Sequence, residues 1–232
     1  MDEKKKKVRW IKHYNSAQKI LLVGEGDFSF SASLARAFGS GRNMVATSLD
    51  SERLLVRKHW SSEQHLVELE NLECLLLHKV DVYEMSYHHT LKHMKFDVVV
   101  FNFPHAGHVY GYTEEDEETI HDHKDLLRGF FKSAREMLVE EGGEVHVTQR
   151  DDHPYNKWEL EKLGAESGFG LKEKVRFEKG DYPGYHNKRG GGINSNKTFP
   201  LKFECFTFKF SLQKENALAE ICSNGISSMT LN

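Results

Sequence analysis

The sequence has little of what secreted or membrane proteins need. Its three cysteines, Cys74, Cys205 and Cys222, lie far apart and form no C-x-x-C pair, which argues against a disulfide framework and a thiolate zinc site. No stretch approaches the roughly 18 uncharged apolar residues of a membrane helix, and no apolar run typical of a signal peptide follows the basic start of the chain. We expect a soluble protein of a reducing, intracellular compartment.

The chain also lacks a large excess of either charge. Lys and Arg number 32, Asp and Glu 35, and the formal net charge is -3, so binding to nucleic acid would have to use local basic patches. With 232 residues and 38% hydrophobic content, one core can serve the whole molecule. We predict one domain over residues 17–212, a basic extension over residues 1–16, and a short helix with a disordered tail over residues 213–232.

Short apolar runs alternate with amphipathic stretches along this domain. Strands are predicted at residues 20–23, 44–49, 75–81, 96–101, 144–148, 171–177 and 201–212. Helices are predicted at residues 30–38, 52–71 with a break near 61–62, 126–140 and 158–167. The alternation favours a mostly parallel sheet with helices on both faces, and a last strand reached by a loop allows an antiparallel pairing. This order is typical of an α/β, Rossmann-like, seven-stranded methyltransferase fold.

A glycine turn joins the first predicted strand to the first predicted helix. It consists of Gly24, Glu25, Gly26, Asp27, Phe28 and Ser29. Such a turn places backbone N–H groups at a helix N-terminus, beside the carboxyl ends of the strands, where open α/β sheets bind ligands. On its own the pattern is equally typical of a tight connection, so its interpretation depends on the residues at the ends of the next strands.

Two carboxylates lie farther along the chain, each at the end of a predicted strand. Asp50 ends the second strand, where a carboxylate accepts hydrogen bonds from ribose hydroxyls, and Asp81 ends the third strand, where an adenine amino group would lie. One such carboxylate is commonly just a helix cap or a turn residue. Two of them, at successive strand ends beside a glycine turn, favour an adenosine pocket.

The charge of the glycine turn favours one of two adenosine-containing cofactors over the other. Ser29 replaces the third glycine of G-x-G-x-x-G, and Glu25 and Asp27 would repel a pyrophosphate. An NAD-dependent oxidoreductase is therefore disfavoured. S-adenosylmethionine carries a sulfonium and an ammonium and no phosphate, so acidic surroundings suit it. We predict S-adenosylmethionine as the cofactor.

Four segments carry a family resemblance: residues 23–31 (VGEGDFSFS), 48–50 (SLD), 78–81 (HKVD) and 101–105 (FNFPH). With them the chain resembles the eukaryotic 25S rRNA uridine-N3 methyltransferase-like family, which includes a plant branch, over roughly residues 17–212. The resemblance implies a Rossmann-like fold and methyl transfer from S-adenosylmethionine to N3 of a uridine in large-subunit rRNA. It also implies action in the nucleus or nucleolus, with the cytoplasm as the alternative.

The resemblance assigns parts of the cofactor to residues of this sequence. Gly24, Gly26 and Asp27 would line its methionine part, Asp50 its ribose and Asp81 its adenine. The full predicted cofactor-binding set is Gly24, Glu25, Gly26, Asp27, Phe28, Ser29, Asp50 and Asp81. Lys79 stands where the resemblance leads us to expect glycine, which favours an alternative function: a catalytically silent, cofactor-binding or RNA-binding scaffold with the same fold.

The predicted catalytic residues are Asn102, Phe103, Pro104 and His105. They follow the fourth strand and resemble the N/D-P-P-Y/F loop of methyltransferases that act on nitrogen. A carboxamide can hold a base edge, and an aromatic ring can stack on a flipped base. His105 is the candidate in this loop for a general base that takes the N3 proton. The alternative is structural: Pro104 ends the strand, Phe103 packs in the core and His105 lies at the surface.

Two further features suggest partners. Residues 181–198 mix aromatic and basic side chains on a glycine-rich backbone, which suits contacts to RNA bases and phosphates and is equally typical of a crossover loop. The histidines at positions 88, 89, 93, 105, 108, 121 and 123 are numerous. No carboxylate or cysteine set matches them in spacing, so no metal is predicted. RNA is the predicted partner, and the sequence does not indicate the oligomeric state.

Overall fold

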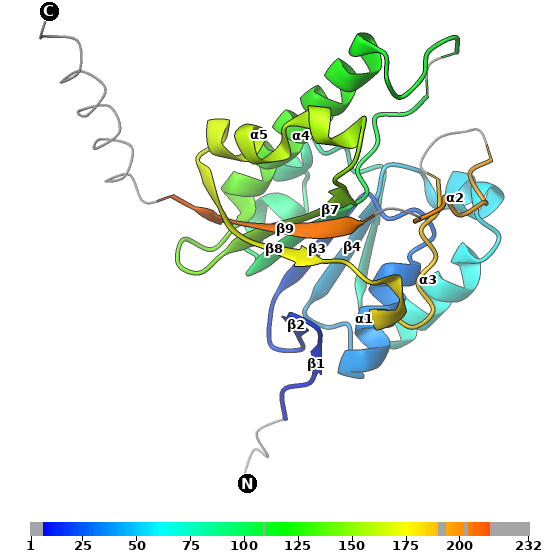
Figure 1. Ribbon diagram of the computed structural model, residues 1–232. Helices are drawn as coiled ribbons and strands as arrows, with labels where there is room; N and C mark the ends of the chain where they lie inside the picture. The colour runs from blue at the N-terminus through cyan, green and yellow to red at the C-terminus, as the bar shows by residue number, and fades with distance from the viewer. Residues whose placement is uncertain (1–6, 109, 190–193, 202–203, 214–232) are drawn as a thin grey trace, which may run out of the picture.

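A seven-stranded sheet organises the molecule in the computed structural model (Figure 1), which describes residues 7–108, 110–189, 194–201 and 204–213. The strands are β3 Ile20–Val23, β4 Met44–Ser48, β5 Leu75–His78, β6 Val98–Asn102, β7 Glu144–Arg150, β8 Phe169–Arg176 and β9 Cys205–Leu212. Their spatial order is β5-β4-β3-β6-β7-β9-β8. The first five pair in parallel, and β9 runs antiparallel to both β7 and β8. The predicted fold, with its antiparallel last strand, is confirmed.

Five helices of the described chain cover the two faces of the sheet. They are α1 Ser29–Phe38, α2 Glu52–Lys58, α3 Ser62–Asn71, α4 Glu117–Met137 and α5 Leu160–Glu166. In Figure 1, α1 and α3 lie on one face, and α4 and α5 lie on the other. Short 3₁₀ turns occur at Met85–Tyr87, Leu91–His93, Tyr155–Trp158 and Lys179–Asp181. No helix of the described residues is long and apolar enough to span a lipid bilayer.

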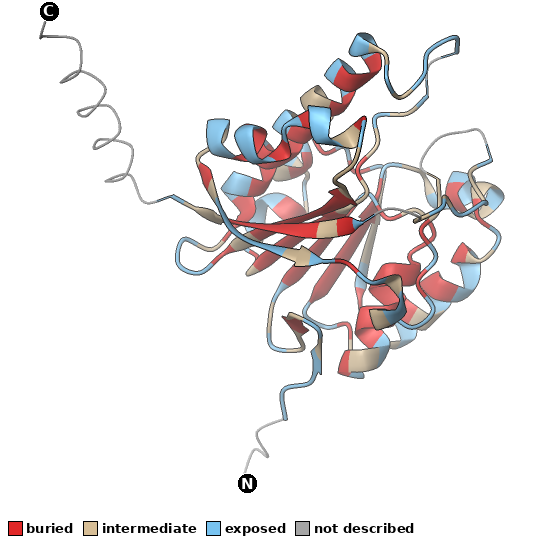
Figure 2. Ribbon diagram, viewed as in Figure 1, coloured by how far each residue is buried: buried red, intermediate tan, exposed pale blue. Residues whose placement is uncertain are grey.

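The central strands are buried on both faces, as their continuous apolar runs predict. In β3, Leu21 and Val23 join a core cluster with the apolar side of α4, and Ile20 and Leu22 join a second cluster with α1 and α3. Figure 2 shows the sheet as a buried layer between helices whose outer faces are exposed. At the edges of this two-sided core the strands end, and polar side chains there can reach a ligand.

Several element boundaries differ from the sequence prediction, most of them by a few residues, and the largest difference is at the start of α4. Helix α4 begins at Glu117, nine residues before the predicted start at 126. Glu117 and Glu118 form its first turn, where their negative charge suits the positive end of the helix dipole. Strand β5 stops at His78, because Lys79 takes a left-handed backbone with φ of 58° and turns the chain out of the sheet.

A small hairpin precedes the sheet. Strands β1 Trp10–Ile11 and β2 Tyr14–Asn15 pair antiparallel, and the Tyr14 ring is 1% exposed within the α1-side core cluster. Residues 10–15 therefore pack against the domain that was predicted to begin at residue 17. The predicted tail over residues 213–232 lies, apart from Gln213, outside the described residues, as does the lysine run up to residue 6.

We expect Phe131→Ala to destabilise the domain by about 3–5 kcal/mol. The Phe131 ring is fully buried on α4, with ring centroids 5.6 Å from Phe169 and 5.2 Å from Phe210, so its loss opens a cavity between helix and sheet. Urea unfolding followed by circular dichroism measures the change. The exposed neighbour Lys132→Ala is the control and should stay within about 0.5 kcal/mol of wild type. Equal stability of both variants would show that this helix face does not hold the fold together.

Candidate functional site

A cavity of about 300 Å³ opens at the carboxyl ends of the central parallel strands. Ten predicted site residues line it: Gly24, Glu25, Gly26, Asp27, Ser29, Asp50, Asp81, Asn102, Phe103 and His105. Two do not. The Phe28 ring is fully buried in the core beside His78, and Pro104 lines a second cavity of about 290 Å³. Phe103 and His105 line both, so the two cavities meet at the loop after β6.

The turn after β3 requires glycine at its first position. Gly24 has a φ of +67°, in the left-handed region, and a Cβ there would lie 2.6 Å from Cε2 of Phe101 on β6. At Gly26 a Cβ would lie 3.3 Å from Cβ of Lys188. The turn is therefore compressed between β6 on one side and the β8–β9 connection on the other.

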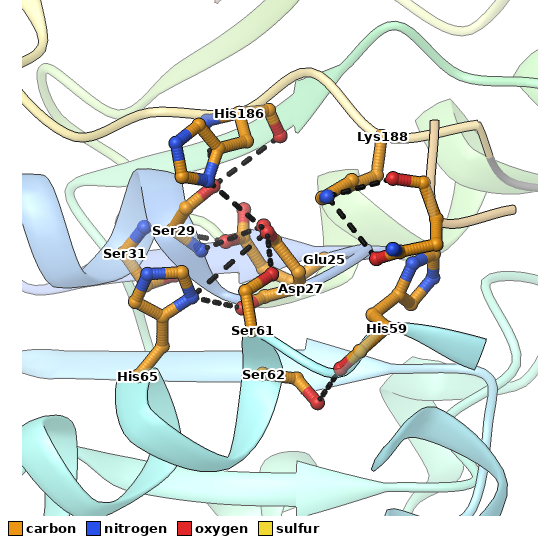
Figure 3. A network of polar contacts seen from close by, with 11 residues as sticks. Glu25, Asp27, Ser29, Ser31, His59, Ser61, Ser62, His65, His186 and Lys188 are labelled. Carbon is orange, nitrogen blue, oxygen red and sulfur yellow. Dashed lines mark hydrogen bonds and ion pairs between the residues drawn. The ribbon is translucent and has the colours of Figure 1, made fainter. Parts of the chain in front are cut away.

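Asp27 is the centre of a polar network that holds this turn in place (Figure 3). Its carboxylate is 2% exposed and accepts hydrogen bonds from the Ser29 backbone N–H at 3.1 Å and from Ser61 Oγ at 2.8 Å. His65 Nδ1 lies 2.7 Å from the Asp27 carbonyl oxygen, and His186 Nδ1 lies 3.6 Å from Oδ2. Asp27 lines the cavity, but both of its carboxylate oxygens already have protein partners.

Glu25 is the carboxylate of the turn with fewer partners. One oxygen, Oε2, accepts from the Ser31 backbone N–H at 3.2 Å. Burial raises the pKa of Glu25 to about 7, and the hydrogen bond from Ser31 offsets only part of this effect. A cation in the cavity would favour the ionised form, since an opposite charge nearby stabilises a carboxylate.

Asp50 and Asp81 mark the far side of the cavity. Both oxygens of Asp50 contact Lys58 Nζ, at 2.8 and 2.9 Å, in a largely buried ion pair. Asp81 Oδ1 accepts from the Tyr83 N–H at 3.0 Å. Between them, Lys79 adopts the left-handed backbone that glycine prefers. The turn toward Asp81 thus exists with a lysine in it, and Val80 and Asp81 both line the cavity.

The end of β6 carries an unusual amide. Among the described residues, neither Nδ2 nor Oδ1 of Asn102 has a hydrogen-bond partner, although both atoms are buried. Gln149, near the end of the neighbouring β7, is likewise buried with an unpartnered Oε1, and it lines the second cavity. Buried polar atoms without partners are rare in proteins and cost about 1–3 kcal/mol each. Both atoms of the Asn102 amide, and Oε1 of Gln149, are therefore available to a ligand.

Phe103 and His105 are more constrained than the sequence indicates. Phe103 packs edge-on against Phe177 and Phe199, with centroids 5.5 and 5.1 Å away. His105 Nδ1 accepts from the Gly107 N–H at 2.9 Å, and Nε2 lies 2.9 Å from Glu114 Oε1. Both ring nitrogens of His105 thus have partners, so neither offers a free lone pair to a substrate proton in this arrangement.

The described residues of the loop, 181–189 and 194–198, include both core positions and cavity-lining positions. Tyr182 and Tyr185 are 3% and 9% exposed and belong to the α1-side core cluster, so neither presents an exposed ring face to an RNA base, although Tyr185 also borders the first cavity. Lys188 lines both cavities, and Arg189 lines the second. Lys58, Arg150 and Tyr155 also line the two cavities, and the sequence does not predict them as site residues because nothing in their local spacing links them to the strand ends.

The chain is similar to known methyltransferases in sequence and in fold. Residues 21–189 match the BMT5-like family, described as rRNA (uridine-N3-)-methyltransferase BTM5-like. An uncharacterized protein of Arabidopsis thaliana is 47% identical over 204 residues, which cover 88% of this chain and 97% of that protein. The 25S rRNA (uridine(2634)-N(3))-methyltransferase of Saccharomyces cerevisiae is 22% identical, with 76% of this chain and 67% of the yeast protein covered. A solved S-adenosylmethionine-dependent methyltransferase from Clostridium acetobutylicum shares the fold, with a TM-score of 0.50 at 14% identity over 84% of each chain.

Glu25→Gln should remove a pH dependence of stability. Because the pKa of Glu25 is raised from 4.5 to about 7, the folded state keeps a proton that the unfolded state has released between these two values. The free energy of unfolding of the wild type should therefore fall as the pH rises through this window, by at most about 3 kcal/mol. The glutamine variant should lack this fall.

Urea unfolding at about pH 5 and about pH 8 measures the effect. The exposed Glu70→Gln is the control and should behave like the wild type. If Glu25→Gln and the wild type show the same pH dependence, Glu25 is ionised in the folded protein and the carboxylate does not meet the low polarity that its burial indicates.

Proposed function

We propose that this chain, which belongs to the BMT5-like family of rRNA (uridine-N3-)-methyltransferases, methylates N3 of a uridine in large-subunit rRNA. S-adenosylmethionine is the methyl donor in this proposal. The observation that carries the proposal is the pair of cavities that meet at Phe103 and His105, beside Asn102. The acidic, glycine-lined cavity suits the cofactor, and the aromatic and basic cavity suits a nucleotide. For an rRNA substrate, the nucleus or nucleolus is the expected place of action.

The first cavity has the chemistry that S-adenosylmethionine requires. Glu25 faces it with a carboxyl group that a cationic ligand would ionise, and the backbone of the glycine turn borders it without side chains. Bound S-adenosylmethionine supplies a methyl group on a positively charged sulfur. Asp50 is the ribose acceptor in this proposal, and Lys58 has to release at least one of its oxygens.

The second cavity is proposed to receive the target base. Phe103, Tyr155 and Trp158 supply aromatic walls, and Lys188 and Arg189 supply positive charge, whereas Arg150 is paired with Asp152. Aromatic faces stack on a flipped base, and basic side chains contact phosphates. The unpartnered amide of Asn102, which borders the cofactor cavity, and that of Gln149 can then hold a uracil edge, which offers both donors and acceptors.

The N3 proton of uracil must leave before or during methyl transfer. His105 stays the predicted base, but it can accept that proton only if its contact with Gly107 or Glu114 opens. Asn102 is proposed to position the base edge so that N3 faces the cofactor cavity. Phe103 and Pro104 complete the loop by fixing its exit from β6.

A catalytically silent scaffold is the second candidate function. The observation in its favour is the Lys58–Asp50 ion pair, which occupies both oxygens of the proposed ribose acceptor. Transfer of tritium from methyl-labelled S-adenosylmethionine to rRNA, with the labelled nucleoside identified by chromatography, separates the two. Labelled 3-methyluridine supports the proposal. Cofactor binding without any transfer to RNA would support the scaffold instead.

Asp50→Ala should weaken binding of S-adenosylhomocysteine by about 1–3 kcal/mol, because the ribose hydroxyls lose a charged acceptor. Isothermal titration calorimetry on the full chain measures the affinity. Asp122→Ala, an exposed carboxylate on α4, is the matched control and should bind as the wild type does. Unchanged affinity in a folded Asp50→Ala variant would remove Asp50 from the cofactor site.

Asn102→Ala should separate binding from turnover. Loss of a contact made to the target base should reduce methyl transfer by about tenfold or more, which corresponds to about 1.4 kcal/mol of transition-state stabilisation, while S-adenosylhomocysteine affinity stays within about twofold. The exposed Asn71→Ala serves as control. If affinity and transfer fall together, Asn102 belongs to the cofactor rather than to the base.

A further inference from the structure

Three side chains from separate segments gather beside the second cavity. His105 lies in the loop after β6, Glu114 in the connection that leads to α4, and His123 on α4 itself. One nitrogen of each histidine and one carboxylate oxygen of Glu114 all lie within 4.8 Å of one another. His105 and His123 meet ring to ring, with centroids 4.4 Å apart and planes at 87°.

The buried member of the cluster has a lone pair with no partner. His123 is fully buried, and its Nδ1 donates to the Thr119 carbonyl at 2.5 Å. That bond leaves Nε2 as the unprotonated nitrogen, and Nε2 has no hydrogen-bond partner among the described residues. The His123 ring also stacks on Trp158, with centroids 4.2 Å apart, so its orientation is fixed.

Glu114 also has a buried atom without a hydrogen-bond partner. Its Oε1 contacts His105 Nε2 at 2.9 Å and His108 Nδ1 at 3.3 Å, but within the described chain its buried Oε2 has no partner. A lone pair of His123 and a lone pair of Glu114 are thus both buried in one cluster without a donor for either. A cation held by this cluster would draw on the His123 nitrogen and the Glu114 carboxylate together, because nitrogen and carboxylate lone pairs are metal ligands.

We propose that His105, Glu114 and His123 form a binding site for one divalent first-row transition-metal ion of the Zn²⁺ class. Two imidazoles and one carboxylate are a recurrent ligand set for such ions, whereas Mg²⁺ prefers oxygen ligands. The His123 Nδ1 bond to a backbone carbonyl is the outer contact that ligating histidines usually make. Three protein ligands leave a coordination position open, and His108 is a further donor beside Glu114.

Metal binding requires one local change. Ligands bound at roughly 2.0–2.2 Å to a tetrahedral ion lie about 3.3 Å apart, so the ion replaces the proton that His105 now shares with Glu114. The His105 ring then carries its proton on Nδ1, and the contact from the Gly107 N–H to Nδ1 must open. The ion would tie the loop after β6 to α4 and so fix the wall of the second cavity, and a metal-bound His105 would position this loop and could not be the base that takes the N3 proton.

The experiment uses the full, untagged chain without RNA or cofactor, so its outcome is independent of the proposed methylation. After treatment with a chelator, the protein is dialysed against Zn²⁺ alone, and bound metal is counted by mass spectrometry. Co²⁺ in place of Zn²⁺ gives an absorption spectrum that reports imidazole ligation, and Mg²⁺ is the hard-ion arm. Thermal melting with and without Zn²⁺ gives a second readout, because a ligand that binds only the folded state raises Tm.

The test variants are Glu114→Gln, which keeps the shape of the side chain, and His123→Ala. The matched control is His121→Ala, an exposed histidine two positions away on the same helix. We expect the wild type and His121→Ala to bind one Zn²⁺ each and to gain Tm, and both test variants to bind at least about tenfold more weakly. Mg²⁺ should have no effect.

Stoichiometric Zn²⁺ uptake that Glu114→Gln leaves unchanged would overturn the proposal, as would a wild type that takes up no Zn²⁺. Should His123→Ala fail to fold, Glu114→Gln decides the outcome, since its fold can be checked by its melting curve in the absence of metal.

Discussion

The approach of the glycine turn to β6 is the contact on which the rest of the site depends. Only a residue without a side chain can place its backbone where a Cβ would lie 2.6 Å from the Phe101 ring. Because β3 and β6 are parallel neighbours, this contact brings the end of β6 and the start of α1 to the same edge of the sheet. The loop from Asn102 to His105 therefore begins beside the turn that borders the first cavity.

Polar groups at this edge divide into those that hold the protein together and those that are left for a ligand. Asp27 uses its carboxylate oxygens to accept from Ser29 and Ser61 and so fixes the turn against α3. Glu25, Asn102 and Gln149 are buried beside the cavities with fewer partners than their chemistry allows. Burying groups in this condition lowers stability, so each of them calls for an explanation such as a bound ligand, an ion or an ordered water.

The histidine cluster on the other side of the loop also contains both polar groups with partners and polar groups without them. His105 is saturated with partners, whereas His123 and Glu114 each keep a buried lone pair unsatisfied. The loop after β6 is consequently held from two directions, by aromatic packing of Phe103 on Phe177 and Phe199 and by the polar cluster at α4. Changes at α4 can thus reach the wall of the second cavity without touching either cavity directly.

The amino-acid sequence alone was enough to predict the fold and to place most of the candidate site residues at one edge of the sheet. Runs such as residues 20–23 predict buried parallel strands, and residues that come directly after such strands must share one edge because parallel strands point the same way. The partners of the site residues depend instead on tertiary packing: Lys58 on Asp50, Ser61 on Asp27, and Glu114 between His105 and His123. Spacing along a chain reveals neighbours on one helix or strand, whereas these contacts join residues whose distance depends on how the helices and loops pack on the sheet.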